Sequence, residues 1–127
     1  PAEAADAANC DAVWDDLWQR FMTGIDYEGL VNVRESGWHR KLHIFQVPFY
    51  YVEYGMAQVG ALQVWRNSLT DQAGAVAAYR EALALGGTRP LPDLFAAAGA
   101  EFRFDTPMLS ELVTLVEQTI AELEAML

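Results

Sequence analysis

Residues 44–65, which read IFQVPFYYVEYGMAQVGALQVW, form the most apolar stretch of the chain and decide its fold class. Apolar side chains fall on every side of a helix drawn through this stretch, which predicts a helix that is buried all round. Pro48 suits the first turn of that helix, because its missing N–H would have no partner there. Gly55 and Gly60 are expected where a neighbouring element packs close to the backbone.

The stretch is not expected to span a membrane, because three polar residues interrupt it: Glu53, Gln58 and Gln63. The whole chain carries 18 Asp and Glu against 8 Lys and Arg, and its formal net charge is −10. That charge repels phosphate backbones and anionic lipids. We therefore expect neither a nucleic-acid partner nor a membrane-surface partner.

One further helix is predicted before this stretch and three after it, which makes an all-α bundle of about five helices. The first helix spans Asp11 to Thr23, with Asp11 as its N-cap. Asp15 and Asp16 are expected on its solvated face. Residues 24–42 lack periodicity and are expected to form a long loop with at most a short turn in it. The apolar stripe of the first helix consists of Trp14, Leu17, Trp18 and Phe21.

The three downstream helices are placed by their caps and stops. Ser68 and Thr70 offer N-cap oxygens for a helix that ends at Gly86-Gly87. A short helix spans Asp93 to Ala98. A last helix, with Thr106 as its cap and Pro107 in its first turn, continues to the C-terminus. The stripe of the first of these helices is Val76, Tyr79 and Leu83. The stripe of the last consists of Leu109, Leu112, Val113, Val116, Ile120, Leu123 and Leu127.

The cysteine count and the first residue bear on compartment and completeness. Cys10 is the single cysteine, so it cannot form an internal disulfide, which fits a reducing, cytoplasmic setting. The chain begins with Pro1 rather than Met, from which we expect a fragment of a larger protein. Residues 1–127 are taken as one helical segment of it.

Two histidines have the spacing of metal ligands on a helix. His39 and His43 are four residues apart, but Arg40 and Lys41 follow the first histidine where a zinc-peptidase motif has its glutamate. Two adjacent cations oppose binding of a divalent metal, so we assign no metal ligand in this chain. A small metal-binding helical protein that uses His39, His43 and Glu53 is kept as a third possibility.

A group of polar aromatic residues follows His43. Tyr50 and Tyr54 share one face of the expected helix, and His43 joins that face if the helix extends back to it. An imidazole and a phenol aimed at one point can donate hydrogen bonds to a carbonyl or an oxyanion. The alternative is that Tyr50, Tyr51 and Tyr54 are core residues whose hydroxyl groups are hydrogen-bonded.

Residues 78–83, AYREAL, suggest a different class of function. They resemble the second helix of a tetratricopeptide repeat, although no second copy lies about 34 residues away. A non-enzymatic helical protein-interaction module is therefore the alternative to an enzyme.

The run HIFQVPFYYVEYGMA at residues 43–57 resembles the C-terminal part of the oligoendopeptidase F family. These enzymes are zinc oligopeptidases of the thimet oligopeptidase clan. The resemblance continues through residues 60–69, GALQVWRNSL, through residues 84–88, ALGGT, and through residues 90–95, PLPDLF. It covers the chain from about Trp14 onward.

The resemblance implies an all-helical peptidase that hydrolyses short peptides in a deep channel. It places on His43 and Tyr54 the residues that contact substrate and stabilise the oxyanion, with Tyr50 or Tyr51 as a second substrate-binding phenol. The HExxH motif and the third zinc ligand of the family precede the matched region, and this sequence contains neither.

The expected function is therefore that of a C-terminal portion, inactive alone, of a zinc metallopeptidase. Zinc belongs to the full-length enzyme and is not bound by this chain. The expected partners are peptide substrates and the missing N-terminal part of the same polypeptide. Apolar surface exposed in a segment of this kind also favours self-association.

Overall fold

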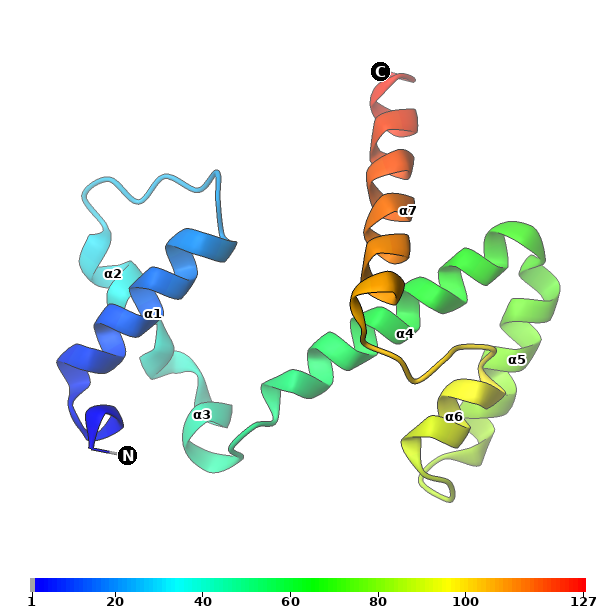
Figure 1. Ribbon diagram of the computed structural model, residues 1–127, viewed down its shortest axis with the longest axis horizontal. Coiled ribbons are helices and arrows are strands. Elements are labelled where there is room, and N and C mark those ends of the chain that lie inside the picture. Colours follow the sequence, from blue (N-terminus) through cyan, green and yellow to red (C-terminus); the bar gives the residue numbers. More distant parts are fainter. Residues whose placement is uncertain (1) are drawn as a thin grey trace. The chain divides into compact units, whose positions relative to one another are not determined.

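The computed structural model describes residues 2–127, and every regular element in this range is a helix (Figure 1). The chain divides into two compact units, Pro1–Tyr51 and Val52–Leu127. The all-α prediction is confirmed. The α-helices are α1 (Ala7–Phe21), α2 (Val31–Glu35), α3 (Leu42–Gln46), α4 (Tyr51–Thr70), α5 (Gln72–Leu85), α6 (Leu91–Ala97) and α7 (Thr106–Glu124), and the 3-10 helices are η1 (Glu3–Ala5) and η2 (Ser36–Arg40).

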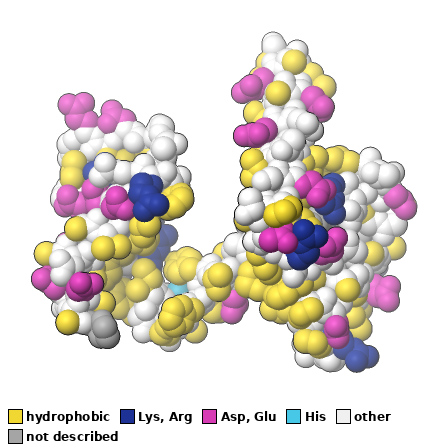
Figure 2. All heavy atoms as spheres, in the orientation of Figure 1, with side chains coloured by type: hydrophobic (Ala, Val, Ile, Leu, Met, Phe, Trp, Pro, Cys, Tyr) yellow, Lys and Arg dark blue, Asp and Glu magenta, His cyan; other side chains and the backbone are white. Residues whose placement is uncertain are grey.

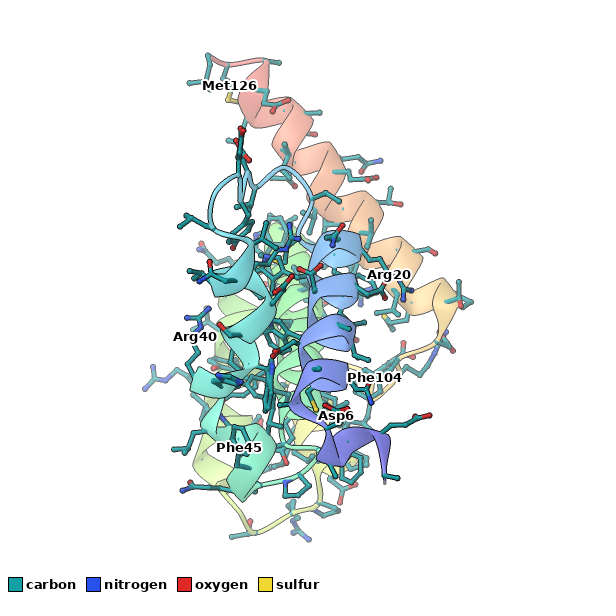
Figure 3. The ribbon with its side chains drawn as sticks, turned by 90° about the vertical axis from the view of Figure 1, so that its left-hand side faces the viewer. Asp6, Arg20, Arg40, Phe45, Phe104 and Met126 are labelled. Carbon is teal, nitrogen blue, oxygen red and sulfur yellow. The ribbon has the colours of Figure 1, made fainter. Side chains whose placement is uncertain are left out.

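In the first unit, η1 is followed by α1, which starts four residues earlier than predicted. Asp6 is its N-cap and accepts a hydrogen bond from the Ala8 amide at 3.0 Å. The prediction that Asp11 caps this helix is therefore wrong. Figure 3 shows Asp6 before the first turn of α1 and Arg20 near its end. The predicted loop over residues 24–42 is also wrong in part, because it contains α2 and η2.

The turn between α3 and α4 delays the start of α4. Phe49 has a φ of 67°, a left-handed conformation that side chains rarely adopt and that a helix cannot contain. The Tyr50 amide donates to the Val47 carbonyl at 3.1 Å, which closes the turn. Pro48 therefore lies in this turn. The prediction that it occupies the first turn of α4 is wrong.

The second unit has a small core where α7 packs on α4. Val59 of α4 packs with Met108 and Leu112 of α7, and Leu62 covers this cluster. The prediction of an α4 buried on all sides is wrong in this structure, because only Val59 and Gln63 of that helix are buried. The described elements of this unit cover one side of α4, while residues such as Val52 are 63% exposed.

Two α4 side chains hold the linker between α6 and α7. The Gln63 amide nitrogen donates to the Glu101 carbonyl at 2.9 Å, and the Glu101 amide donates back to the Gln63 oxygen at 2.8 Å. Asn67 donates to the Gly99 carbonyl at 2.7 Å. These bonds satisfy backbone groups in a segment that has no regular structure of its own.

Helices α5 and α7 are capped by aspartates that lie next to the predicted caps, whereas the N-cap of α6 is Pro90, whose side chain forms no cap hydrogen bond. Asp71 caps α5 by accepting from the Gly74 amide, and Asp105 caps α7 by accepting from the Met108 amide. The predictions of Ser68, Thr70 and Thr106 as caps are therefore wrong. The Ser68 hydroxyl instead donates to the Trp65 carbonyl. The predicted stop of α5 is confirmed at Leu85.

The apolar stripes of α5 and α7 are mostly exposed. On α5 the buried residues are Ala75 and Ala82, which are small enough to let neighbouring elements approach. The predicted apolar stripe is about half exposed, so the prediction that it lies in the core is wrong. The stripe consists of Val76, Tyr79 and Leu83. On α7 the buried residues are Met108 and Leu112.

Gly60→Ala is expected to destabilise the second unit. A Cβ at Gly60 would lie 2.9 Å from Cε1 of Phe95, so the ring must move, at a cost of about 1–3 kcal/mol. Gly55 is the matched control, because no described atom outside the backbone of its own helix turn lies within 4 Å of its added Cβ. The close approach of a neighbouring element predicted at Gly55 is therefore wrong. Gly55→Ala should stabilise the helix by about 0.5–1 kcal/mol. Urea unfolding of both variants tests this, and equal effects would contradict it.

Candidate functional site

Three of the four predicted site residues meet in the first unit. The His43 ring stacks on the Tyr50 ring, with centroids 4.9 Å apart and an interplanar angle of 19°. The Tyr51 ring meets His43 edge to face at 5.1 Å and 72°. The Lys41 ammonium lies 5.9 Å from the centroid of the Tyr51 ring. The structure thus places an imidazole, two phenols and a cation within one small cluster.

The cluster is built by the turn and not by one continuous helix. His43 lies on α3, Tyr50 ends the turn and Tyr51 begins α4. The expectation that His43 and Tyr50 share a face because a helix runs back from Tyr50 is therefore wrong. A hydrogen-bonded turn with a left-handed backbone at Phe49 separates α3 from α4, and the two rings stack across this turn.

Tyr54, the fourth predicted residue, lies on α4 in the second unit. It stands three residues after Tyr51 on the same helix, and its side chain is 50% exposed. The roles of His43 and Tyr54 in catalysis, and of Tyr50 and Tyr51 in substrate binding, stay predictions.

A second arrangement in the first unit was missed by the sequence reading. Asp15, expected on the solvated face of α1, forms a two-pronged ion pair with Arg34 of α2. Asp16 does lie exposed beside Arg20. Arg34 of this pair lines a cavity of about 300 Å³ whose other walls include Trp14, Trp18, Tyr27 and His39. Arg34 is 19 residues from Asp15, so no local pattern could reveal the pair.

Asp11 serves the same region. Its carboxylate accepts a hydrogen bond from the Trp38 indole at 2.7 Å and lies 3.9 Å from Nε2 of His39. The His39 ring in turn packs against Trp38, with centroids 4.3 Å apart. A residue that the sequence suggested as a helix cap therefore joins α1 to η2.

Acid is expected to weaken the α1–α2 contact. The hydrogen bond from Arg34 lowers the pKa of Asp15 below the 3.8 of an unperturbed aspartate, and Gln19 adds to this effect. Since the folded-state pKa is the lower one, the stabilisation is complete above pH 3.8 and is lost as the pH falls through the folded-state pKa.

The measurement is urea unfolding of the chain between about pH 6 and about pH 3. Asp15→Asn should remove part of the acid-induced loss of stability. The matched control is Asp16→Asn, which changes the adjacent exposed carboxylate and should leave that loss as it is. If the two variants lose the same stability in acid, the ion pair between Asp15 and Arg34 does not contribute to the acid-induced loss.

The described residues form neither a metal-ligand cluster nor a membrane-spanning helix. Within residues 2–127, no three His, Cys, Asp or Glu side chains gather as they would around a metal ion. His39 and His43 thus belong to no such group there. None of the described helices combines the length and apolarity needed to cross a bilayer.

Comparison with known proteins shows a match to a family model. Residues 1–114, about nine-tenths of the chain, match the family model described as peptidase family M3. Searches of curated proteins and of solved structures returned no match. The matched range includes the His43–Tyr50–Tyr51 cluster, Tyr54 and the α4–α7 core, so the chain belongs to peptidase family M3.

Proposed function

We propose that residues 1–127 are the C-terminal portion of a zinc-dependent metallo-oligopeptidase of the oligoendopeptidase F type, which hydrolyses short peptides in the cytoplasm. The observation that carries this proposal is the match to peptidase family M3 over residues 1–114. The run at residues 43–57, which resembles the oligoendopeptidase F signature, supports the narrower assignment.

The chain's contribution is hydrogen bonding to the substrate. His43 and Tyr54 would donate hydrogen bonds to the carbonyl oxygen of the cleaved bond as it gains negative charge, and Tyr50 and Tyr51 would bind the peptide. The stacking of His43 on Tyr50 supports this proposal, because packed rings hold a donor in one orientation and avoid the cost of ordering it during the reaction.

Zinc is assigned to another part of the parent polypeptide. The described residues of this chain do not fit a zinc site, since they offer no group of three ligands and the sequence has no HExxH motif. We therefore propose that the chain is inactive alone, and that its partners are peptide substrates and the preceding part of the parent.

The test compares the natural polypeptide with residues 1–127. Its intact mass in the cells that make it, with the reading frame upstream of Pro1, should reveal a larger protein with an HExxH motif. The larger protein should cleave a fluorogenic short peptide in a zinc-dependent manner, and residues 1–127 should not. Zinc-dependent hydrolysis by residues 1–127, or a natural mass of 14.1 kDa, would refute the proposal. Peptide binding by a free-standing 14.1 kDa chain would instead favour the interaction module.

A further inference from the structure

Helix α7 has an apolar face that continues past its contact with α4. Met108 and Leu112 are buried on Val59, but the adjoining residues of the helix are not. At 3.6 residues per turn, five apolar residues fall within about 80° of arc beside the buried face. We call them the α7 stripe: Leu109, Val113, Val116, Ile120 and Leu123.

Four of the five residues of the α7 stripe are exposed. Apart from the half-buried Val116, its members are between 41% and 58% exposed. Their spacing alternates between four and three residues, which is the seam spacing of helices that pack side by side. A stripe of this kind, about four turns in length, is typical of a helix-docking surface.

Acidic residues border the stripe. Glu117 and Glu124 lie on its outer edge, seven residues apart, which is about 10 Å along the helix axis. Helix α7 has no Lys or Arg, and no ion pair joins Glu117 or Glu124 to another described residue. In the view of Figure 2, the far end of α7 shows hydrophobic and acidic side chains but no basic ones.

The contact between α4 and α7 shows how this helix pairs with a neighbour. Leu112 packs on the apolar face of α4, and beside it Arg66 of α4 forms an ion pair with Glu111 of α7 at 2.5 Å. An apolar seam is thus bordered by a glutamate from α7 and an arginine from its neighbour. The α7 stripe has the same features on the α7 side. It is an apolar seam bordered by glutamates, here Glu117 and Glu124.

We propose that the α7 stripe docks a partner helix that has apolar residues at the same spacing and Lys or Arg opposite Glu117 and Glu124. A second copy of this chain fits less well, because its α7 would bring four further glutamates and no cation. In an antiparallel pair of copies, Glu117 would face Glu124 of the other copy, and like charges at such positions repel.

The test uses two synthetic three-heptad helical peptides that share Ile and Leu at the seam positions. One carries Lys at the flanking positions and the other carries Glu. Fluorescence anisotropy with residues 1–127 should give the Lys peptide a Kd at least about tenfold lower than that of the Glu peptide, and about 0.5 M NaCl should reduce this ratio. Ile120→Asp, at an exposed position, should abolish binding without loss of helicity by circular dichroism.

A charge-swap pair makes the result specific to this surface. Glu117→Lys with Glu124→Lys should reverse the preference between the two peptides. Glu81→Lys with Glu122→Lys makes the same change in net charge away from the stripe and should preserve the original preference. Equal binding of both peptides, no binding, or equal effects of the two double variants would overturn the proposal. So would a dimer in sedimentation that Ile120→Asp dissociates, because a second copy would then occupy the stripe. None of these outcomes depends on peptidase activity.

Discussion

Tyr54→Phe in the complete peptidase is expected to lower kcat by about 10²–10³-fold, because a single oxyanion donor typically contributes that much. The substitution removes only the hydroxyl group, and Tyr54 is already 50% exposed on α4, so the fold should tolerate it. Zinc content and the KM for a short peptide should change little. The measurement is steady-state kinetics together with metal analysis of the same preparation.

Tyr79 provides the matched control for this prediction. It lies on α5, is 47% exposed and belongs to none of the predicted site residues. Tyr79→Phe should therefore leave kcat as in the unaltered enzyme. Loss of zinc in step with loss of activity would give Tyr54 a structural role, and an unchanged kcat would remove it from the site altogether.

Gln63→Leu is expected to destabilise the second unit by about 2–5 kcal/mol. The Gln63 side chain is fully buried and pairs with both backbone groups of Glu101. Leucine has a similar size but cannot form either bond, so the Glu101 amide and carbonyl lose their partners, each at about 1–3 kcal/mol. Urea unfolding followed by circular dichroism measures the change as a lower midpoint.

Gln58 is the corresponding control on the same helix. It is exposed, and Gln58→Leu should change the free energy of unfolding by no more than about 0.5 kcal/mol. A Gln63→Leu variant as stable as Gln58→Leu would mean that water or a shifted linker satisfies Glu101. A fall in midpoint for both variants alike would point to helix propensity and not to the buried amide.

The elements of the fold that the sequence predicted are those with local signals. The stop of α5 follows from Gly86, which has a φ of 54°, and the helical period of residues 106–124 is visible in the sequence alone. Caps were missed by a few residues because several Asp, Ser and Thr compete near each helix start. Only the backbone geometry decides which of them accepts the bond, as Asp71 does in place of Ser68 or Thr70.

Burial and the candidate site depended on distant partners. The apolar residues of α4 and α5 suggested that both helices are buried. Burial depends on which other elements cover a helix, and the apolarity of the helix does not reveal those elements. The contact between His43 and Tyr50 requires the left-handed backbone at Phe49, a residue type that gives no such signal. The pairing of Asp15 with Arg34 likewise joins residues that no helical spacing relates.

The bond pair between Gln63 and Glu101 also sets which positions can vary. Both bonds on the residue-101 side use main-chain atoms, so they do not depend on which side chain stands there. The Glu101 side chain itself forms only an exposed pair with Arg103. Position 101 should therefore accept many residues other than proline, whose nitrogen has no hydrogen to donate. Position 63 should accept almost none, so the mutational tolerance of this contact is confined to one of its two ends.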